Sequence, residues 1–458
     1  MSQASNDSDH GIYRARREML AERLRLAGGG VALVPTAPVA IRSRDSEFPF
    51  RHDSYFHYLT GFTEPEALLA IVCDASGVRS HLFCRARDPE QEVWTGWRLG
   101  PDAAPAALGV DAAAPIERLD AELPGLLADR PAVWLGFGHS AALDARVAAA
   151  FERLRERARS GVQPPAALRD LTPLLDEMRL VKDAQEIGTM KRAIAISAHA
   201  HIRAMRHARA GQREYELEAE LLHEFRRHGA QSPAYGSIVA SGANACVLHY
   251  ERNDARMAPG SLVLIDAGCE LDGYAADITR TFPVDGRFTP EQRAVYEVVL
   301  AAQAAAIDCV LPGQPFDAAH DAAVRVLAQG LVDLKLLAGS VDEVIASGAY
   351  KRFYMHRTGH WLGLDVHDAG DYREPLAATL GSPDAAAERP SRRLKPGMVV
   401  TVEPGLYLRG DDLPPGFRDI GIRIEDDVLV TVAEGEVLSE AAPKSVAAIE
   451  TLMAEARA

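Results

Sequence analysis

Apolar and polar positions alternate along the first part of the chain in patterns that predict a helix followed by strands. Residues 13–27 carry apolar side chains at helical spacing among several arginines, and three glycines at 28–30 end that pattern. The apolar run VALVP follows at once and predicts a strand. The chain therefore opens as a helix that leads into a sheet.

Further apolar runs predict the remaining strands of this first domain. ALLAIVCD, VRSHLFCR and AVWLGFG are each typical of a strand, and a turn at residues 75–77 joins the first two. Residues 141–159 have a helical pattern, which gives way to a stretch that contains three prolines. We therefore place a domain boundary there, between a compact α/β domain over residues 1–175 and a second domain over residues 176–458.

The second domain shows long alanine-rich and charged helical patterns, with strands between and after them. Helices are predicted for residues 184–208, 214–228 and 290–310. The sequence PDAAAERP at residues 383–390 predicts an exposed insertion. The whole chain is therefore assigned to the mixed α/β (α+β) class.

The charge balance and the cysteines narrow the function classes. The 65 acidic and 50 basic residues give a formal net charge of -15, which disfavours binding to nucleic acid. The five cysteines are scattered without a C-x-x-C pair, so we expect reduced thiols in a cytoplasmic protein. The polar N-terminus and the lack of an apolar run of ~18 residues predict neither a signal peptide nor a membrane span.

The strongest local pattern is SLVLIDAGCELDGYAADITRTFPV, which predicts a β-hairpin. With its turn at residues 271 and 272, Asp266 and Asp277 would lie opposite one another with Cβ atoms ~5 Å apart. Two carboxylates at that distance either share a proton or are neutralised by a cation. The alternative on this segment alone is a pair of solvated hairpin aspartates.

A histidine cluster follows in YMHRTGHWLGLDVHD. His356, His360 and His367 lie within twelve residues, beside Gly359 and Gly363, where backbone can approach a ligand closely. A single histidine in such a segment would more often be a packed or capping residue. Three of them favour a binding site.

Two acidic positions accompany apolar strand patterns near the end of the chain. Glu403 follows the run MVVTV, where burial would cost several kcal/mol unless a cation or hydrogen bonds compensate it. Glu425 follows Arg423 by two residues, which places both side chains on one face of a strand. Glu403 is the harder of the two to explain structurally.

These residues form an oxygen-rich donor set that suits Mn²⁺, Co²⁺ or Zn²⁺, and the absence of cysteine argues against a structural zinc site. Its members are Asp266, Asp277, His360, Glu403 and Glu425. Because they offer more carboxylate oxygens than one small ion needs, we expect two divalent ions ~3.5 to 4 Å apart. Such a pair lowers the pKa of water and makes hydroxide available near neutral pH.

In these motifs the sequence resembles the pita-bread metallopeptidases, and within them the aminopeptidase P branch, over essentially its whole length. The segments LIDAG, DITRTF, HWLGLDVHD, TVEPGLY and GIRIEDD hold the five residues in the family's ligand order of Asp, Asp, His, Glu, Glu. The segment FPFRHDSYFHYLTGFTEPEALLAIV is similar to the accessory domain of aminopeptidase P and of prolidase. The resemblance implies an N-terminal α/β accessory domain followed by a pita-bread catalytic domain.

The resemblance also implies roles for residues outside the ligand set. His249 in LHYERN, His356 and His367 would line the substrate pocket and stabilise the tetrahedral intermediate, and Arg423 would support the ligands. A metal-bridging hydroxide would attack the scissile carbonyl while Glu403 relays a proton to the proline nitrogen. Manganese is the metal that the family suggests.

The activity that the resemblance implies is removal of the residue before a proline at a peptide's N-terminus. A prolidase, which cleaves only Xaa-Pro dipeptides, is the first alternative, and a metal-free binding module or a creatinase-like amidinohydrolase is the second. The family also implies a homodimer or homotetramer. Trp94 would then approach a neighbouring subunit's active site, or else be an ordinary core tryptophan.

Overall fold

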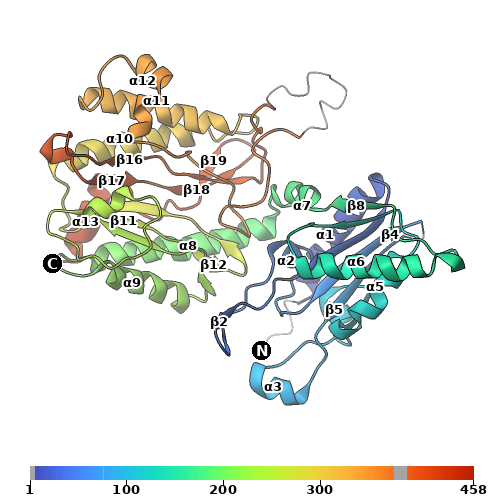
Figure 1. Cartoon of the computed structure of the whole chain (residues 1–458). Helices are drawn as coiled ribbons and strands as arrows, with labels where there is room; N and C mark the ends of the chain where they lie inside the picture. Colours follow the sequence, from blue (N-terminus) through green and yellow to red (C-terminus); the bar gives the residue numbers. More distant parts are fainter. Residues whose placement is uncertain (1–5, 76, 376–388) are drawn as a thin grey trace. The chain divides into compact units, whose positions relative to one another are not determined.

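The computed structural model describes residues 6–75, 77–375 and 389–458. The chain divides into two compact units, Met1–Met178 and Arg179–Ala458 (Figure 1), close to the boundary that the proline-containing stretch predicts. Most of the predicted insertion at residues 383–390 lies outside the described residues. Among the described residues, no helix is both long and apolar enough to cross a membrane.

A six-stranded sheet forms the centre of the first unit, in the order β6-β5-β4-β1-β7-β8. β1 pairs antiparallel with β4 and parallel with β7, so the sheet is mixed. The predicted strands are confirmed, whereas the turn predicted between β4 and β5 contains Ser76, which lies outside the described residues. The strands of this unit are β1 (Gly30–Pro35), β2 (Ile41–Ser43), β3 (Ser46–Glu47), β4 (Leu68–Asp74), β5 (Gly77–Cys84), β6 (Ala112–Pro115), β7 (Ala132–Leu135) and β8 (Ala167–Asp170).

Helices pack on this sheet, and the interior between them is apolar. Val31, Leu33 and Phe83 of the sheet share one buried cluster with Leu119 of α5 and Leu143 of α6. The alternate positions of β1 reach this face because successive strand side chains point to opposite sides. The helices predicted at residues 13–27 and 141–159 are confirmed. The helices are α1 (Asn6–Leu26), α2 (Ser54–Thr60), α3 (Pro89–Thr95), α4 (Ala104–Leu108), α5 (Leu119–Leu127), α6 (Ala141–Glu156) and α7 (Thr172–Arg179).

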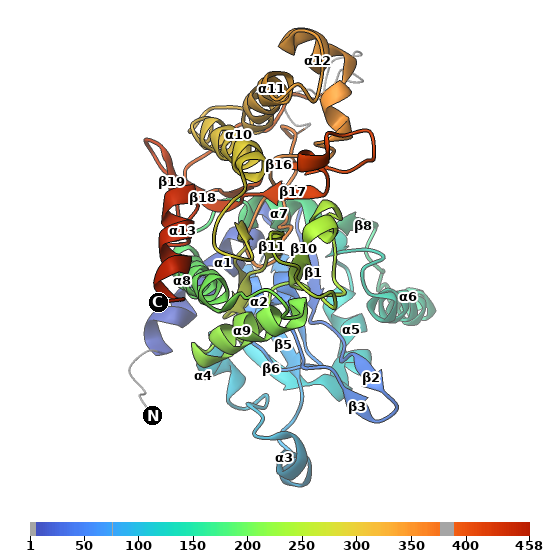
Figure 2. The same ribbon diagram turned by 90° about the vertical axis from the view of Figure 1, so that its left-hand side faces the viewer.

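The second unit is layered, with β16 (Gly405–Leu408), β17 (Ile420–Arg423) and β18 (Asp426–Val430) between the helices α10 and α11 on one side and α8 and α9 on the other (Figures 1 and 2). A capping box of Asp183 and Glu186 starts α8, where the predicted helix begins. The three helices predicted in this region are confirmed. The helices of this unit are α8 (Ala184–His207), α9 (Glu214–Arg227), α10 (Pro290–Ile307), α11 (Asp317–Asp333), α12 (Val341–Ser347) and α13 (Val446–Glu455).

Several small sheets supply the strands of this layer, in the orders β10-β11-β14, β13-β12-β9, β15-β18-β19 and β16-β17. Their strands are β9 (Ser232–Pro233), β10 (Ile238–Ser241), β11 (Leu262–Asp266), β12 (Cys269–Leu271), β13 (Tyr274–Ala275), β14 (Thr279–Pro283), β15 (Val399–Val402), β16 (Gly405–Leu408), β17 (Ile420–Arg423), β18 (Asp426–Val430) and β19 (Gly435–Val437).

The hairpin that runs from β11 to β14 has a different register from the predicted one. Asp266 pairs with Thr279, so the expectation that it lies directly opposite Asp277 is wrong. The turn sits one residue later, at Asp272 and Gly273, whose φ angles are 51° and 85°. An Asp-Gly pair favours a two-residue turn with both φ angles positive. Because the slip is two residues along the partner strand, Asp277 still shares a face with Asp266.

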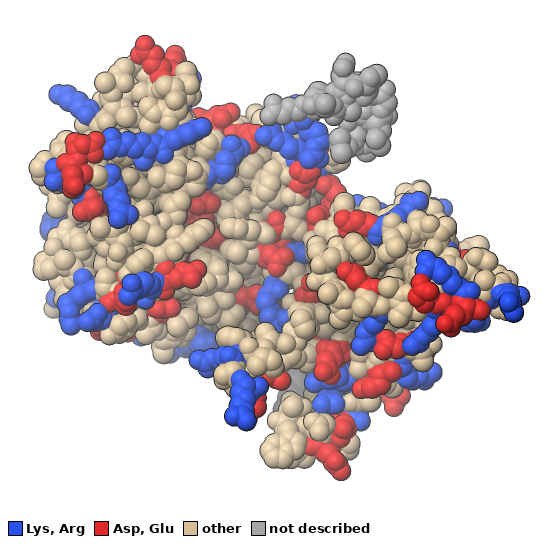
Figure 3. All heavy atoms as spheres, viewed as in Figure 1, with Lys and Arg blue, Asp and Glu red and all other residues tan. Residues whose placement is uncertain are grey.

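The surface charges of the two units are mixed. Figure 3 shows basic and acidic side chains interspersed over the visible face of each unit, although acidic residues are in excess in the whole chain. Interspersed charges favour solubility.

Candidate metal centre

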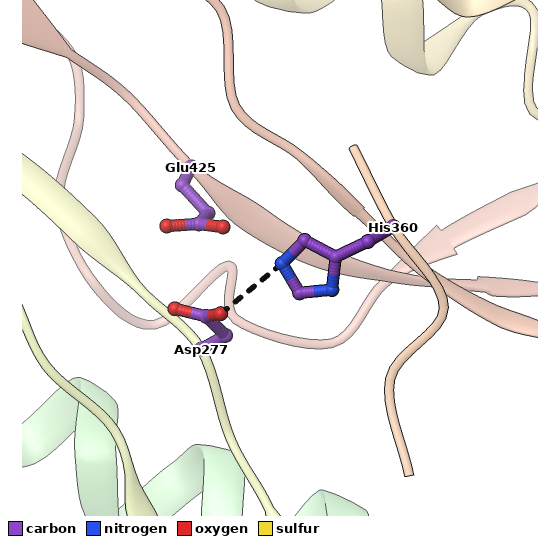
Figure 4. Close-up of side chains that lie close together, drawn as sticks. All are labelled: Asp277, His360 and Glu425. Carbon is purple, nitrogen blue, oxygen red and sulfur yellow. Dashed lines mark ion pairs between the residues drawn. The ribbon is translucent and has the colours of Figure 1, made fainter. Parts of the chain in front are cut away.

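Three of the predicted ligands converge in the second unit. Asp277, His360 and Glu425 each place one ligand atom within 4.8 Å of the others, and their side chains point toward one another in Figure 4. The His360 Nε2 atom lies 3.4 Å from an Asp277 carboxylate oxygen. Asp277 precedes β14, His360 lies before β15, and Glu425 separates β17 from β18. Residues far apart in the sequence thus meet at one point.

Close backbone packing holds His360 in place. Its N–H donates to the Thr401 hydroxyl at 3.1 Å, and the Thr401 N–H donates to the His360 carbonyl at 2.9 Å. A Cβ at Gly359 would lie only 2.0 Å from the Thr401 carbonyl oxygen. The glycine before the histidine therefore allows this segment to lie directly against β15.

Glu403 follows β15 and faces the same centre. Its carboxylate lies 3.7 Å from the His360 Nε2 atom and 3.9 Å from the His356 Nδ1 atom, and its side chain is 19% exposed. Burial raises the pKa of Glu403 to about 7, although the charges of His360 and Arg423 oppose the rise. Glu403, whose place after an apolar strand was hard to explain from the sequence, is thus largely buried beside two imidazoles.

Asp266 is joined to the centre through Tyr235. The Tyr235 hydroxyl lies 2.6 Å from one Asp266 carboxylate oxygen and 2.5 Å from one of Asp277. The buried Arg423 donates to the other Asp266 oxygen at 2.5 Å. Burial alone would raise the pKa of Asp266, but the Arg423 charge and the hydrogen bonds from Tyr235 and Arg423 lower it. No sequence motif distinguishes Tyr235, so its position in the site was not predicted.

The centre holds more buried negative charge than its own cations balance. Burial, with the charges of Asp277 and Glu403, raises the pKa of Glu425 well above its ordinary value. The pKa of His360 rises to about 9 because its hydrogen bond to Asp277 and the charge of Glu403 outweigh burial. A divalent cation would neutralise this surplus, and the oxygen-rich donors suit one. The residues present therefore fit a metal site.

Two more predicted histidines lie against this centre. The His356 Nε2 atom is 2.8 Å from the Tyr407 hydroxyl, and burial and the Arg423 charge lower the pKa of His356 to about 4. The His367 ring centroid is 4.3 Å from that of His360. Burial and the His360 charge lower the pKa of His367. Both imidazoles are therefore neutral at pH 7.

The remaining predicted residues are more exposed. His249 is exposed on the loop after β10, yet its charge contributes to lowering the pKa of His367, so it lies near that ring. Trp94 belongs to α3 of the first unit and is 84% exposed. The alternative that made Trp94 a core tryptophan is therefore wrong.

A buried ion cluster supports the loop that carries His367. The next residue, Asp368, receives hydrogen bonds from Arg179 at 2.6 Å and from Lys182 at 2.8 Å, and all three side chains are at most 2% exposed. A Cβ at Gly363 would lie 2.3 Å from the Asp368 carboxylate. No motif in the sequence predicted this cluster.

Comparison with known families agrees with this geometry. The profile described as metallopeptidase family M24 matches residues 188–432, more than half of the chain, and the aminopeptidase P N-terminal domain matches residues 13–134. The chain belongs to metallopeptidase family M24, in its aminopeptidase P branch. It is therefore a metallopeptidase of the Xaa-Pro aminopeptidase type, and the predicted family is confirmed.

Relatives match this M24 chain over nearly its full length. The Xaa-Pro aminopeptidase of Escherichia coli is 45% identical over 97% of the chain and 98% of its own length. That of Haemophilus influenzae is 45% identical over 90% of each chain. The solved Pseudomonas aeruginosa aminopeptidase PepP has a TM-score of 0.93 at 50% identity, with 98% of both chains covered. The predicted fold class, an N-terminal α/β domain and a C-terminal pita-bread catalytic domain, is confirmed.

Proposed function

We propose that this M24 chain releases the N-terminal residue from peptides that carry proline in the second position, at the centre formed by Asp277, His360 and Glu425. The observation that carries the proposal is the convergence of their ligand atoms within 4.8 Å. Xaa-Pro aminopeptidases 45% identical to this chain over nearly its full length support the substrate class. Solved E. coli aminopeptidase P complexes hold a product and the inhibitor Pro-Leu.

The cofactor in this proposal is a pair of divalent ions, with manganese favoured and cobalt or zinc compatible with the same donors. The ligand set would be Asp266, Asp277, His360, Glu403 and Glu425. When bound, such ions supply a hydroxide near neutral pH and polarise the scissile carbonyl. The buried negative charge of the centre supports this assignment.

Glu403 is the proton relay of the reaction. A carboxylate beside the reacting groups can accept a proton during attack and return it to the leaving proline nitrogen. The Glu403 carboxylate lies 3.9 Å from His356 and 3.7 Å from His360, which supports this role. Arg423 holds Asp266 in orientation through the 2.5 Å hydrogen bond.

Three histidines form the substrate side of the site. His367 is a neutral imidazole against the centre, so it can donate one N–H to a carbonyl oxygen or to the developing oxyanion. The Nδ1–H of the neutral His356 donates to the Arg357 carbonyl at 2.7 Å, and its Nε2 accepts from the Tyr407 hydroxyl at 2.8 Å, so His356 orients Tyr407 at the edge of the site. His249 lies close enough to His367 to influence its pKa. All three are assigned to substrate binding and to stabilisation of the tetrahedral intermediate.

Assembly and location complete the proposal. The exposed Trp94 would reach the substrate site of a neighbouring copy in a homodimer or homotetramer. The five cysteines are free, which agrees with a reducing, cytoplasmic location.

The test is a paired hydrolysis assay on an Xaa-Pro dipeptide and the matching Xaa-Pro-Xaa tripeptide. Each substrate is assayed after removal of metal with a chelator and again after addition of Mn²⁺. Manganese-restored release of the first residue from the tripeptide is the expected result. Cleavage of the dipeptide alone would assign a prolidase instead, and silence on both substrates would overturn the peptidase assignment.

A further inference from the structure

Tyr235 connects the two aspartates of the hairpin without being one of the five proposed ligands. Its hydroxyl lies 2.6 Å from Asp266 and 2.5 Å from Asp277. These two carboxylates sit diagonally across the strand pair, where side chains are farther apart than in a directly opposite pair. The hydroxyl therefore spans the gap that the observed register leaves between them.

The backbone beside Tyr235 is fixed to the same hairpin. β9 pairs with β12, and the Ala234 N–H donates to the Gly268 carbonyl at 2.9 Å. A Cβ at Gly268 would lie 1.7 Å from the Ala276 carbonyl oxygen, so the hairpin closes tightly just before Asp277. The tyrosine and both aspartates are thus carried by one connected set of strands.

Each aspartate has its two oxygens assigned to different partners. Asp266 uses one oxygen for Tyr235 and the other for Arg423, at 2.5 Å. One Asp277 oxygen lies against the same Tyr235 hydroxyl, whose single proton the two carboxylates share, and the other faces His360 at 3.4 Å. A carboxylate held at both oxygens has little freedom to rotate. Groups that orient ligands in this way raise metal affinity, and their removal typically weakens it about 10- to 100-fold.

We propose that Tyr235 is a positioning residue that sets the spacing and orientation of Asp266 and Asp277 for metal binding. The inference rests on the proposed metal centre and adds to it a residue outside the ligand set. Tyr235 acts through the two carboxylates, so its hydroxyl determines how tightly the ions are held.

The test compares Tyr235→Phe with wild type and with Tyr274→Phe. Tyr274→Phe is a matched control because it also removes a phenol-to-carboxylate hydrogen bond, to Glu186 at 2.9 Å, from the same hairpin. Affinity for Mn²⁺ is measured by titration calorimetry with a competing chelator, and kcat is measured on a tripeptide substrate across Mn²⁺ concentrations.

Tyr235→Phe should weaken Mn²⁺ binding about 10- to 100-fold, while Tyr274→Phe stays within about threefold of wild type. At saturating Mn²⁺ the kcat of Tyr235→Phe should return to within about threefold of wild type. Mn²⁺ affinity equal to that of the control would overturn the inference, and so would a kcat that stays low at saturation. Failure of wild type to bind Mn²⁺ would instead overturn the proposed function.

Discussion

The two units bury charge in opposite ways. In the first unit, the buried Arg17 donates to the backbone carbonyls of Leu59 and Leu108 at 2.8 and 3.1 Å, and burial lowers its pKa to about 10. In the second unit, the fully buried Arg280 donates to the Asp426 carboxylate at 2.6 Å. The buried arginine of the first unit is thus hydrogen-bonded to uncharged backbone carbonyls, whereas the buried arginine of the second unit is paired with a carboxylate.

This difference distinguishes a unit whose interior is structural from a unit whose interior holds the candidate active site. Removing two charges from water costs several kcal/mol per ion, and a buried pair regains this only with good geometry and further hydrogen bonds. The second unit contains such pairs and also buries Glu425 and Glu403 close together, and burial with the neighbouring carboxylates raises the pKa of both. A bound cation would stabilise their charged forms, which locates the chemistry in this unit.

The contrast is tested most strongly at Glu403. Glu403→Ala should lower kcat at least ~10³-fold, because it removes a proposed metal ligand and the proton relay together. Steady-state hydrolysis of a tripeptide at saturating Mn²⁺ measures the loss. Asp120→Ala in the first unit, which removes an exposed partner of Arg146, is the control and should keep wild-type kcat. Near-normal turnover in Glu403→Ala would contradict the assigned role.

A second large effect is expected at the ion cluster beside His367. Asp368→Asn removes the buried counter-charge of Lys182 and leaves Arg179 paired with the more exposed Asp365, so it should destabilise the second unit by roughly 3–5 kcal/mol. Hydrogen exchange of the amides in that unit measures the change. The matched variant is Asp74→Asn in the first unit, whose partner Arg130 is 22% exposed and for which roughly 1 kcal/mol is expected. An equal loss of stability in Asp368→Asn and Asp74→Asn would contradict the proposed difference between the two units.

The pH dependence of stability gives an intermediate effect. Burial lowers the pKa of His201 to about 4, while the unfolded chain takes up this proton near pH 6.5. Neutral His201 therefore contributes its full share to the free energy of unfolding above pH 6.5. As the pH falls toward 4, the free energy of unfolding decreases by roughly 3 kcal/mol.

His201→Gln isolates this contribution, because glutamine retains an N–H donor for the Ala267 carbonyl that His201 contacts at 3.0 Å. Urea unfolding of metal-free protein at pH 7 and pH 4 measures the difference between variant and wild type. The variant should lose less stability on acidification than wild type. Identical acid losses would show that His201 does not titrate as the structure implies.

The smallest effect is expected at the surface of the first unit. Arg146 and Asp120 form a pair at 3.0 Å with 41% and 56% of their side chains exposed. Solvent screens such pairs, so Arg146→Ala should change the free energy of unfolding by less than about 1 kcal/mol. Urea titration at low and high salt measures it. A loss comparable to that of Asp368→Asn would mean that exposed charges also matter in this unit.

The sequence predicts what is local and misses what depends on distant pairing. The strands of the first unit and the helices at 184–208 and 290–310 follow from short apolar patterns. The predicted hairpin register was wrong because it placed the turn at residues 271 and 272. The Asp272-Gly273 pair adopts positive φ angles readily, so the turn forms one residue later. The face shared by Asp266 and Asp277 survived only because the slip was two residues.

Other site residues have no local signal. Asp368 meets Arg179, which lies 189 residues earlier, and Tyr235 meets Asp266, which lies 31 residues later. No periodicity links such positions. The exposure of Trp94 was equally undecided, since its residue type fits both a core and a surface. Glu403 could be predicted because a carboxylate directly after an apolar strand is costly to bury and therefore needs a functional explanation.

The tight backbone crossings at Gly268 and Gly359 restrict how this enzyme can be engineered. Any side chain there would put its first carbon 1.7 Å or 2.0 Å from a carbonyl oxygen of the neighbouring segment. Neither glycine is among the residues assigned to substrate binding, so a mutagenesis library aimed at new specificity would readily include them as small, adaptable positions. Variants at either one would move Asp277 or His360 rather than reshape a pocket, and such libraries are better confined to the side chains around them.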